Sequence, residues 1–223
     1  MRALPGTVVA HPEDTVKTSR RIIALVLLLA TPSIARTQSR TELHDAMRKL
    51  WTDHVVWTRL FIISAAANLG DKDVTTKRLL QNQTDIGDAV VAFYGRDAGT
   101  KLTGLLTSHI LIAADLVGAA KAGNAAAVDS LNKKWRVNAD ELATFLHAAN
   151  PQHWPTATLR TAMYTHLDQT LSEATHRLKG DYAADVKDFD AIVQHILAMA
   201  DMLSDGIVAQ FPQRFNRVAK TPR

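Results

Sequence analysis

Three histidines recur along the chain, each 14 to 16 residues before a glycine that is followed by a polar residue. The histidines are His54, His109 and His166, and the pairs that follow them are Gly70-Asp71, Gly123-Asn124 and Gly180-Asp181. Fifteen residues after each glycine stands another polar residue on an otherwise apolar stripe, namely Asp85, Asn138 and His195. This recurrence predicts a helical hairpin that is repeated three times.

The spacing also predicts how deep these side chains lie. An α-helix rises about 1.5 Å per residue, so sequence distance from a turn converts into depth in a bundle. If the three turns lie at one end, the three histidines lie roughly 21 to 24 Å from that end, and the other three polar residues about 22 Å from it. We therefore expect one polar layer made of His54, Asp85, His109, Asn138, His166 and His195.

A layer of this composition is suited to binding a metal. Neutral imidazole is the commonest protein ligand for transition metals, and helical bundles build such sites from inward side chains on facing helices. The expected ligands are His54, Asp85, His109, His166 and His195, and Thr58, Asn82 and Asn138 are expected to orient them from behind. Because the chain has no cysteine, we expect zinc, copper(II) or iron rather than copper(I). Haem held by two histidines from opposed helices is the alternative cofactor.

Two other interpretations of the layer stay open. Buried polar side chains often do no more than hydrogen-bond and fix the register of helices, which would make this a structural or interaction protein. Alternatively, His54 as a base with Asp85 as its partner would serve a small-ligand binder or a cofactor-free enzyme. That arrangement requires an open pocket beside the two residues.

The surrounding sequence is helical in pattern. From Thr41 onward, apolar residues recur at steps of three and four, and no segment alternates with period two. Turns are expected at Gly70, over residues 95–99, at Asn150-Pro151 and Trp154-Pro155, and at Gly180. The sequence therefore predicts an all-α fold, an up-and-down bundle of about six helices over residues 41–212. A basic tail is expected over residues 213–223.

The N-terminal region has the pattern of an export signal. An apolar run over residues 22–30 follows Lys17 and Arg20-Arg21, and small residues precede a cleavage site expected after Ala35. We expect residues 1–35 to be a signal peptide with an upstream extension and residues 36–40 a linker, so that the protein is periplasmic or secreted. The alternative is a membrane anchor over residues 22–35. Ser19-Arg20-Arg21 leaves open twin-arginine export instead of the general pathway.

Composition limits the function further. The net charge of +4 derives partly from the N-terminal segment, and the rest is too small and too evenly spread to predict nucleic-acid binding. No glycine-rich loop follows a strand, so nucleotide binding is not expected. Glu173 and His176 match one Glu-x-x-His pair of di-iron bundles, but the second pair that such sites need is missing. The sequence favours a protein without enzymatic activity, and a cofactor-free enzyme that uses His54 and Asp85 stays the alternative.

Seven motifs in order resemble a group of uncharacterised bacterial helical proteins. They are Trp51–Arg59, Gln81–Gly87, Tyr94-Gly95, His109–Ala113, Asn138–Asp140, His195–Asp201 and Gln210–Pro212. The resemblance covers about residues 43–215 and implies a helical fold without a known activity. Members are sometimes labelled glycosyltransferase or acetylglutamate kinase. Both activities use α/β folds, so this sequence does not support either label.

Overall fold

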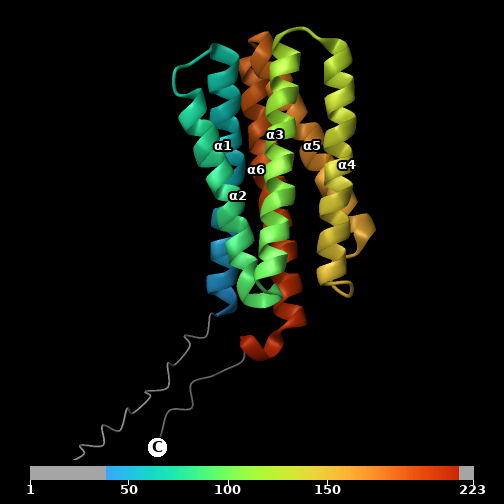
Figure 1. Ribbon diagram of the computed structural model, residues 1–223. Coiled ribbons are helices and arrows are strands. Elements are labelled where there is room, and N and C mark those ends of the chain that lie inside the picture. The colour runs from blue at the N-terminus through green and yellow to red at the C-terminus, as the bar shows by residue number, and fades with distance from the viewer. Residues whose placement is uncertain (1–38, 216–223) are drawn as a thin grey trace, which may run out of the picture. The chain divides into compact units, whose positions relative to one another are not determined.

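The computed structural model describes residues 39–215, which form the all-α up-and-down bundle expected from the sequence (Figure 1). Its six α-helices are α1 (Arg40–Ala67), α2 (Lys72–Tyr94), α3 (Arg96–Lys121), α4 (Ala125–Ala149), α5 (Thr156–Lys179) and α6 (Tyr182–Gln210), followed by a 3-10 turn, η1 (Pro212–Arg214). The turns that close the hairpins α1–α2, α3–α4 and α5–α6 lie at one end of the bundle (Figure 1).

The helices do not contribute equally to the centre. The first helices of the three hairpins, α1, α3 and α5, contact one another. The second helices pack in the grooves between them: α2 contacts α1 and α3, α4 contacts α3 and α5, and α6 contacts α5 and α1. The bundle is therefore a ring of six helices whose alternate members meet inside it, and the histidine of each hairpin lies on an inner helix.

Local sequence explains where the helices begin and end. Ser39 and Glu42 form a reciprocal capping box at the start of α1. Asn124 and Asp181 cap α4 and α6 through their side chains. Gly123 and Gly180 adopt positive φ angles of 67° and 78°, as expected for turns that close helices.

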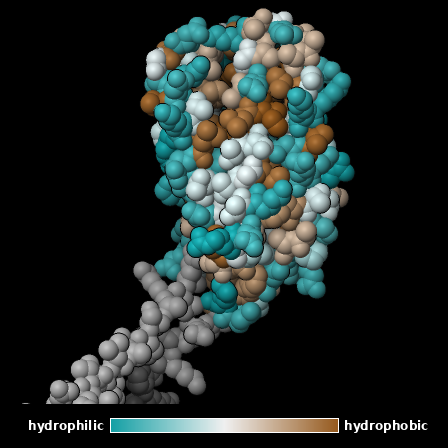
Figure 2. All heavy atoms as spheres, in the orientation of Figure 1, coloured by the Kyte–Doolittle hydropathy of each residue, from teal (hydrophilic) through white to brown (hydrophobic). Residues whose placement is uncertain are grey.

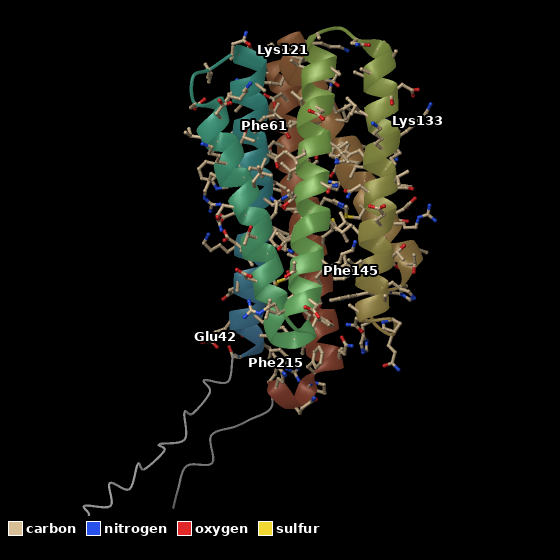
Figure 3. All side chains as sticks on the ribbon, in the orientation of Figure 1. Glu42, Phe61, Lys121, Lys133, Phe145 and Phe215 are labelled. Carbon is tan, nitrogen blue, oxygen red and sulfur yellow. The ribbon has the colours of Figure 1, made fainter. Side chains whose placement is uncertain are left out.

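The first hairpin turn differs from the expectation. Asn68, not Gly70, is the residue in the left-handed conformation, with φ of 53°. An asparagine side chain tolerates this conformation better than most residues do. Near this turn, Lys121 at the top of α3 (Figure 3) donates hydrogen bonds to the Ala65 carbonyl and to Oδ1 of Asn68. These bonds fix the end of α3 against the first turn.

The connection between α2 and α3 is shorter than the expected turn over residues 95–99. It consists of Gly95 alone, with φ of 84°, and Gly99 already belongs to α3. A Cβ atom added at Gly87 would lie 2.7 Å from the Gly99 carbonyl oxygen and 2.0 Å from Oγ1 of Thr103. Glycines on both helices therefore permit the backbones of α2 and α3 to approach closely.

The opposite end of the bundle is closed by aromatic packing. Trp154, in the loop between α4 and α5, is 1% exposed and lies against Gly206 of α6, where an added Cβ would be 2.0 Å from its indole nitrogen. Phe215, after η1, stacks on Phe93 with ring centroids 5.9 Å apart and is labelled at this end in Figure 3. The first residues of the expected basic tail thus pack on the bundle.

A buried ion cluster joins α1, α5 and α6 between the histidines and the hairpin turns. Arg59 donates to Glu173 at 2.5 Å and to Asp185 at 2.7 Å, and Arg177 reaches Asp185 at 3.3 Å. Both carboxylates are almost fully buried, at 2% and 1% exposure. Burial raises the pKa of Glu173 to about 7, although its hydrogen bond from Arg59 acts in the opposite direction. His176 is not part of this cluster, and its Nδ1 atom lies 2.7 Å from Oδ2 of Asp188.

Two of the described helices, α3 and α6, are long and apolar enough to cross a membrane by length and composition alone. Within their most apolar windows, 39% of the α3 residues and 44% of the α6 residues are buried inside the bundle. Figure 2 shows hydrophobic residues gathered on the upper half of one face, around α3. The expected signal peptide, its upstream extension, the alternative anchor over residues 22–35 and the last tail residues lie outside the described part of the chain.

The close approach of α2 and α3 is testable with Gly87→Ala. The added methyl group would collide with α3 backbone and side-chain atoms, so we expect destabilisation of about 1 to 3 kcal/mol. The control is Gly104→Ala in α3, where nothing lies within 4 Å of an added Cβ; alanine there should stabilise by about 0.5 to 1 kcal/mol. Equal melting temperatures for the two variants would contradict the close contact.

The ion cluster predicts a pH-dependent stability. Since the pKa of Glu173 is raised in the folded state, folding retains a proton that the unfolded chain releases between about pH 4.5 and 7, and this contribution to stability falls as pH rises through that window. Glu173→Gln removes this titrating group. The melting temperature of the variant minus that of wild type should therefore rise from pH 5 to pH 8. Glu141→Gln, at an exposed position of α4, is the control. A pH-independent difference for Glu173→Gln would refute the prediction.

Candidate functional site

Three of the expected ligands meet at the centre of the bundle. His54, His109 and His166 come from the inner helices α1, α3 and α5, and they are 2%, 2% and 4% exposed. The ring centroids of His54 and His166 are 5.6 Å apart, and those of His109 and His166 are 6.3 Å apart. The sequence repeat therefore corresponds to a cluster in space, which we call the histidine trio.

The trio is electrically neutral at physiological pH. Burial lowers the pKa of His54 to about 3 and that of His109 to about 4, and it holds the pKa of His166 well below its usual range. Repulsion among the imidazoles acts in the same direction for His54 and His166. A neutral imidazole keeps a nitrogen lone pair, which is the form that binds metals.

Each inner helix is backed by a polar residue 29 positions after its histidine. Gln83 lies beside His54, with its Nε2 atom 3.4 Å from Nδ1, and Oδ1 of Asn138 lies 2.8 Å from Nδ1 of His109. The same spacing separates His166 from His195. Because Oδ1 of Asn138 can only accept, Nδ1 of His109 donates and its Nε2 atom carries the lone pair. The tautomer of His109 is thus set by α4.

The second helices also hold the inner helices through one repeated hydrogen bond. Asn82 donates to the Leu50 carbonyl, Asn138 to the Leu105 carbonyl and His195 to the Ala162 carbonyl. In each hairpin that carbonyl lies four residues before the histidine of the trio. The repeat in the sequence is therefore also a repeat of contacts, and it fixes each outer helix at the level of the trio.

Asp85 does not join the trio. Its side chain is 37% exposed, accepts a hydrogen bond from Gln81 and lies 3.9 Å from Arg78 on the outside of the bundle. The reason is the first turn: the residue equivalent to Gly123 and Gly180 is Asn68, so the position facing His54 moves from Asp85 to Gln83. The expected pairing of His54 as a base with Asp85 is therefore absent from the structure.

The remaining expected residues take supporting positions. His195 is half-buried, and its Nε2 atom bonds the Ala162 carbonyl, so it lies behind His166. Thr58 donates to the carbonyl of His54 itself, and Thr170 repeats this bond to the carbonyl of His166. Thr58 thus supports the helix backbone and does not orient an imidazole. Asn82, in addition to its bond to Leu50, accepts from Gln83.

The histidine trio borders a central cavity of about 30 Å³. Its lining contains the trio, aliphatic side chains and Trp51 and Trp154, and among the residues described it includes no charged side chain. Four of the five methionines of the chain also line it: Met47, Met163, Met199 and Met202. The volume accommodates about two or three water-sized particles, since one needs roughly 10 to 15 Å³. A porphyrin is far larger, so haem does not fit the cavity in this conformation.

Several polar atoms around the trio lack a partner within the described chain. Nδ1 of His166, Oε1 of Gln83 and the indole nitrogens of Trp51 and Trp135 are buried without a hydrogen bond. The indole of Trp51 lies 5.6 Å from the His54 ring and that of Trp135 lies 5.1 Å from the His109 ring. Native proteins satisfy most buried polar atoms, so their concentration here distinguishes this region from the rest of the core.

The donor atoms are not arranged around a common metal position. Over residues 39–215, no three side chains of histidine, cysteine, aspartate or glutamate form a ready metal group. The expected set of four histidines and Asp85 is therefore divided: three histidines share the centre, His195 lies behind them and Asp85 lies at the surface. The sequence interpretation missed Gln83 and the methionines, although the spacing of 29 residues identifies Gln83 once the second and third hairpins are aligned.

Comparison with known proteins adds no relative. The chain matches no protein-family model, no curated protein and no solved structure. The resemblance to uncharacterised bacterial helical proteins stays a prediction, and the interpretation of the site depends on its own geometry.

Replacing Asn138 tests the contacts that hold the trio. Asn138→Ala leaves the buried Nδ1 donor of His109 without a partner and removes the bond to the Leu105 carbonyl, which we expect to cost about 1 to 3 kcal/mol in unfolding free energy. Asp85→Ala is the matched control in the facing hairpin and should change stability by less than about 0.5 kcal/mol. Urea unfolding measures both. A larger loss for Asp85→Ala than for Asn138→Ala would contradict the placement of the layer.

Proposed function

We propose that this is an exported metal-binding protein that holds a single transition-metal ion through the histidine trio. The observation that carries the proposal is that three inner helices each bring one neutral, buried imidazole to the same small cavity. Hydrogen bonds within the described chain engage the trio only at Nδ1 of His54 and His109, so none of these bonds occupies Nε2 of a ring.

The distances support this proposal. Two imidazoles on one zinc ion, with Zn–N bonds of about 2.0 to 2.1 Å, have ring centroids roughly 5 to 6 Å apart. The separation of 5.6 Å between the His54 and His166 rings lies within this range, and that of 6.3 Å between the His109 and His166 rings lies slightly above it. Convergence of the nitrogens on one point then requires rotation of the rings and a small approach of the His109 side chain.

The partners of the rings support it as well. Ligating histidines usually donate their second ring N–H to a carbonyl or carboxylate oxygen, as His109 does to Asn138. His166 has an unpartnered Nδ1 and is not restrained by such a bond. At His54, Nε2 of Gln83 donates to the Leu79 carbonyl and to Oδ1 of Asn82 and lies 3.4 Å from Nδ1, so Nδ1 is the acceptor of this ring and metal binding at Nε2 would require the other tautomer.

A structural role is the second candidate, and a different observation favours it. The bonds from Asn82, Asn138 and His195 to three inner-helix carbonyls fix the register of the bundle without any ligand. This role explains the outer residues of the polar layer. It leaves unexplained why three imidazoles from different helices border one cavity.

Metal titration separates these candidates. The full chain, stripped with a chelator, should bind one equivalent of an added transition metal, with the content measured by mass spectrometry after dialysis. A metal at 100 times its dissociation constant should stabilise the fold by about 2.7 kcal/mol. We expect His109→Ala and His166→Ala to abolish retention, while His153→Ala, which changes an exposed histidine, retains the wild-type content. If wild type retains no zinc, copper or iron, or if the trio variants retain as much as His153→Ala, the proposal fails.

A further inference from the structure

The chemistry of the central cavity narrows the identity of the ion, which deepens the proposed function and rests on it. The histidine trio supplies nitrogen ligands, and the closest pair, His54 and His166, needs further donors to complete a coordination shell. The only other heteroatoms of metal-binding type that line the cavity, among the residues described, are the thioether sulfurs of its four methionines.

The methionines follow the histidines along the same helix faces. Met163 precedes His166 by three residues on α5, and Met47 precedes His54 by seven on α1. Residues at these spacings share one face of a helix. Met199 comes from α6, which packs between α1 and α5. Methionine side chains from three helices therefore border the cavity on the side away from the hairpin turns.

Charge provides an independent criterion. The described residues that line the cavity include no aspartate, glutamate or other ionised group. A divalent ion would bring two uncompensated positive charges into an apolar interior, and the cost of burying an ion grows steeply with its charge. A monovalent ion faces a much smaller cost. A neutral set of ligands in an apolar site therefore favours an ion of low charge.

We infer that the central cavity is a site for a soft monovalent cation, copper(I), bound by imidazole nitrogen from the trio and by methionine sulfur. Thioether ligands favour copper(I) over the harder divalent metals. The uncharged lining of the cavity also favours a monovalent ion. This reverses the preference for zinc, copper(II) or iron that the absence of cysteine had suggested, because the methionines supply the soft ligands that cysteine would otherwise provide.

Silver(I) is a suitable probe, since it shares the charge and softness of copper(I) and is not oxidised during the experiment. The full chain is labelled with methyl-¹³C methionine and titrated with silver nitrate in chloride-free buffer. We expect methyl resonances of cavity methionines to shift and saturate at one equivalent. Met1, which lies outside the described residues, supplies the reference resonance. The double variant Met163→Leu/Met199→Leu assigns these signals and nearly conserves side-chain volume.

Affinity measurements complete the test. The double variant should bind silver(I), and copper(I) in competition with a chromogenic chelator, at least tenfold more weakly than wild type, with an unchanged affinity for zinc(II). If zinc(II) binds through the trio while silver(I) binds no more tightly or leaves the methionine methyl signals unmoved, the copper(I) inference is wrong and the proposed metal binding survives. If no metal is retained by the wild type, both fail.

Discussion

The structure depends on the satisfaction of polar groups where three inner helices meet. Burying an imidazole in an apolar core is costly unless its nitrogens find partners. Here the second helix of each hairpin reaches across to the first and bonds the carbonyl four residues before the histidine. The same hydrogen bond occurs in all three hairpins and fixes the register of the two helices in each. It therefore sets the depth of the histidine trio and holds α1, α3 and α5 inside the ring of six helices.

These hydrogen bonds satisfy the carbonyls of the inner helices more completely than they satisfy the imidazoles. Asn138 serves both the Leu105 carbonyl and His109, whereas in the first hairpin the task is divided between Asn82 and Gln83. In the third hairpin, His195 serves the carbonyl and leaves Nδ1 of His166 without a partner. The protein thus keeps its most demanding buried group unsatisfied at the edge of a cavity. Such an arrangement destabilises the fold unless binding uses it.

Different kinds of side chain pack on the two sides of the histidine trio. Toward the hairpin turns, the trio is followed by a compact ion cluster in which Arg59 bonds both Glu173 and Asp185. On the other side lie the methionines and the aromatic closure around Trp154. Among the described residues, the buried carboxylates Glu173 and Asp185 therefore lie on one side of the trio, and no buried charge lies on the other. In the proposed site, a cation would be coordinated by neutral atoms alone, which would favour a monovalent ion over a divalent one.

The sequence by itself determined the helices, the three hairpins and the three histidines at their centre. These features depend on local periodicity, on caps such as Asn124 and Asp181, and on the fixed rise of a helix, all of which can be read along one chain. The first turn was the exception, because Asn68 and Gly70 are both compatible with a left-handed residue and only packing against Lys121 and α3 selects one. Because the left-handed residue of the first turn lies two positions earlier than expected, Gln83 and not Asp85 lies beside His54. Only the tertiary structure decided that the methionines border the trio and that the carboxylates do not, because the set of side chains that share a cavity depends on how separate helices pack.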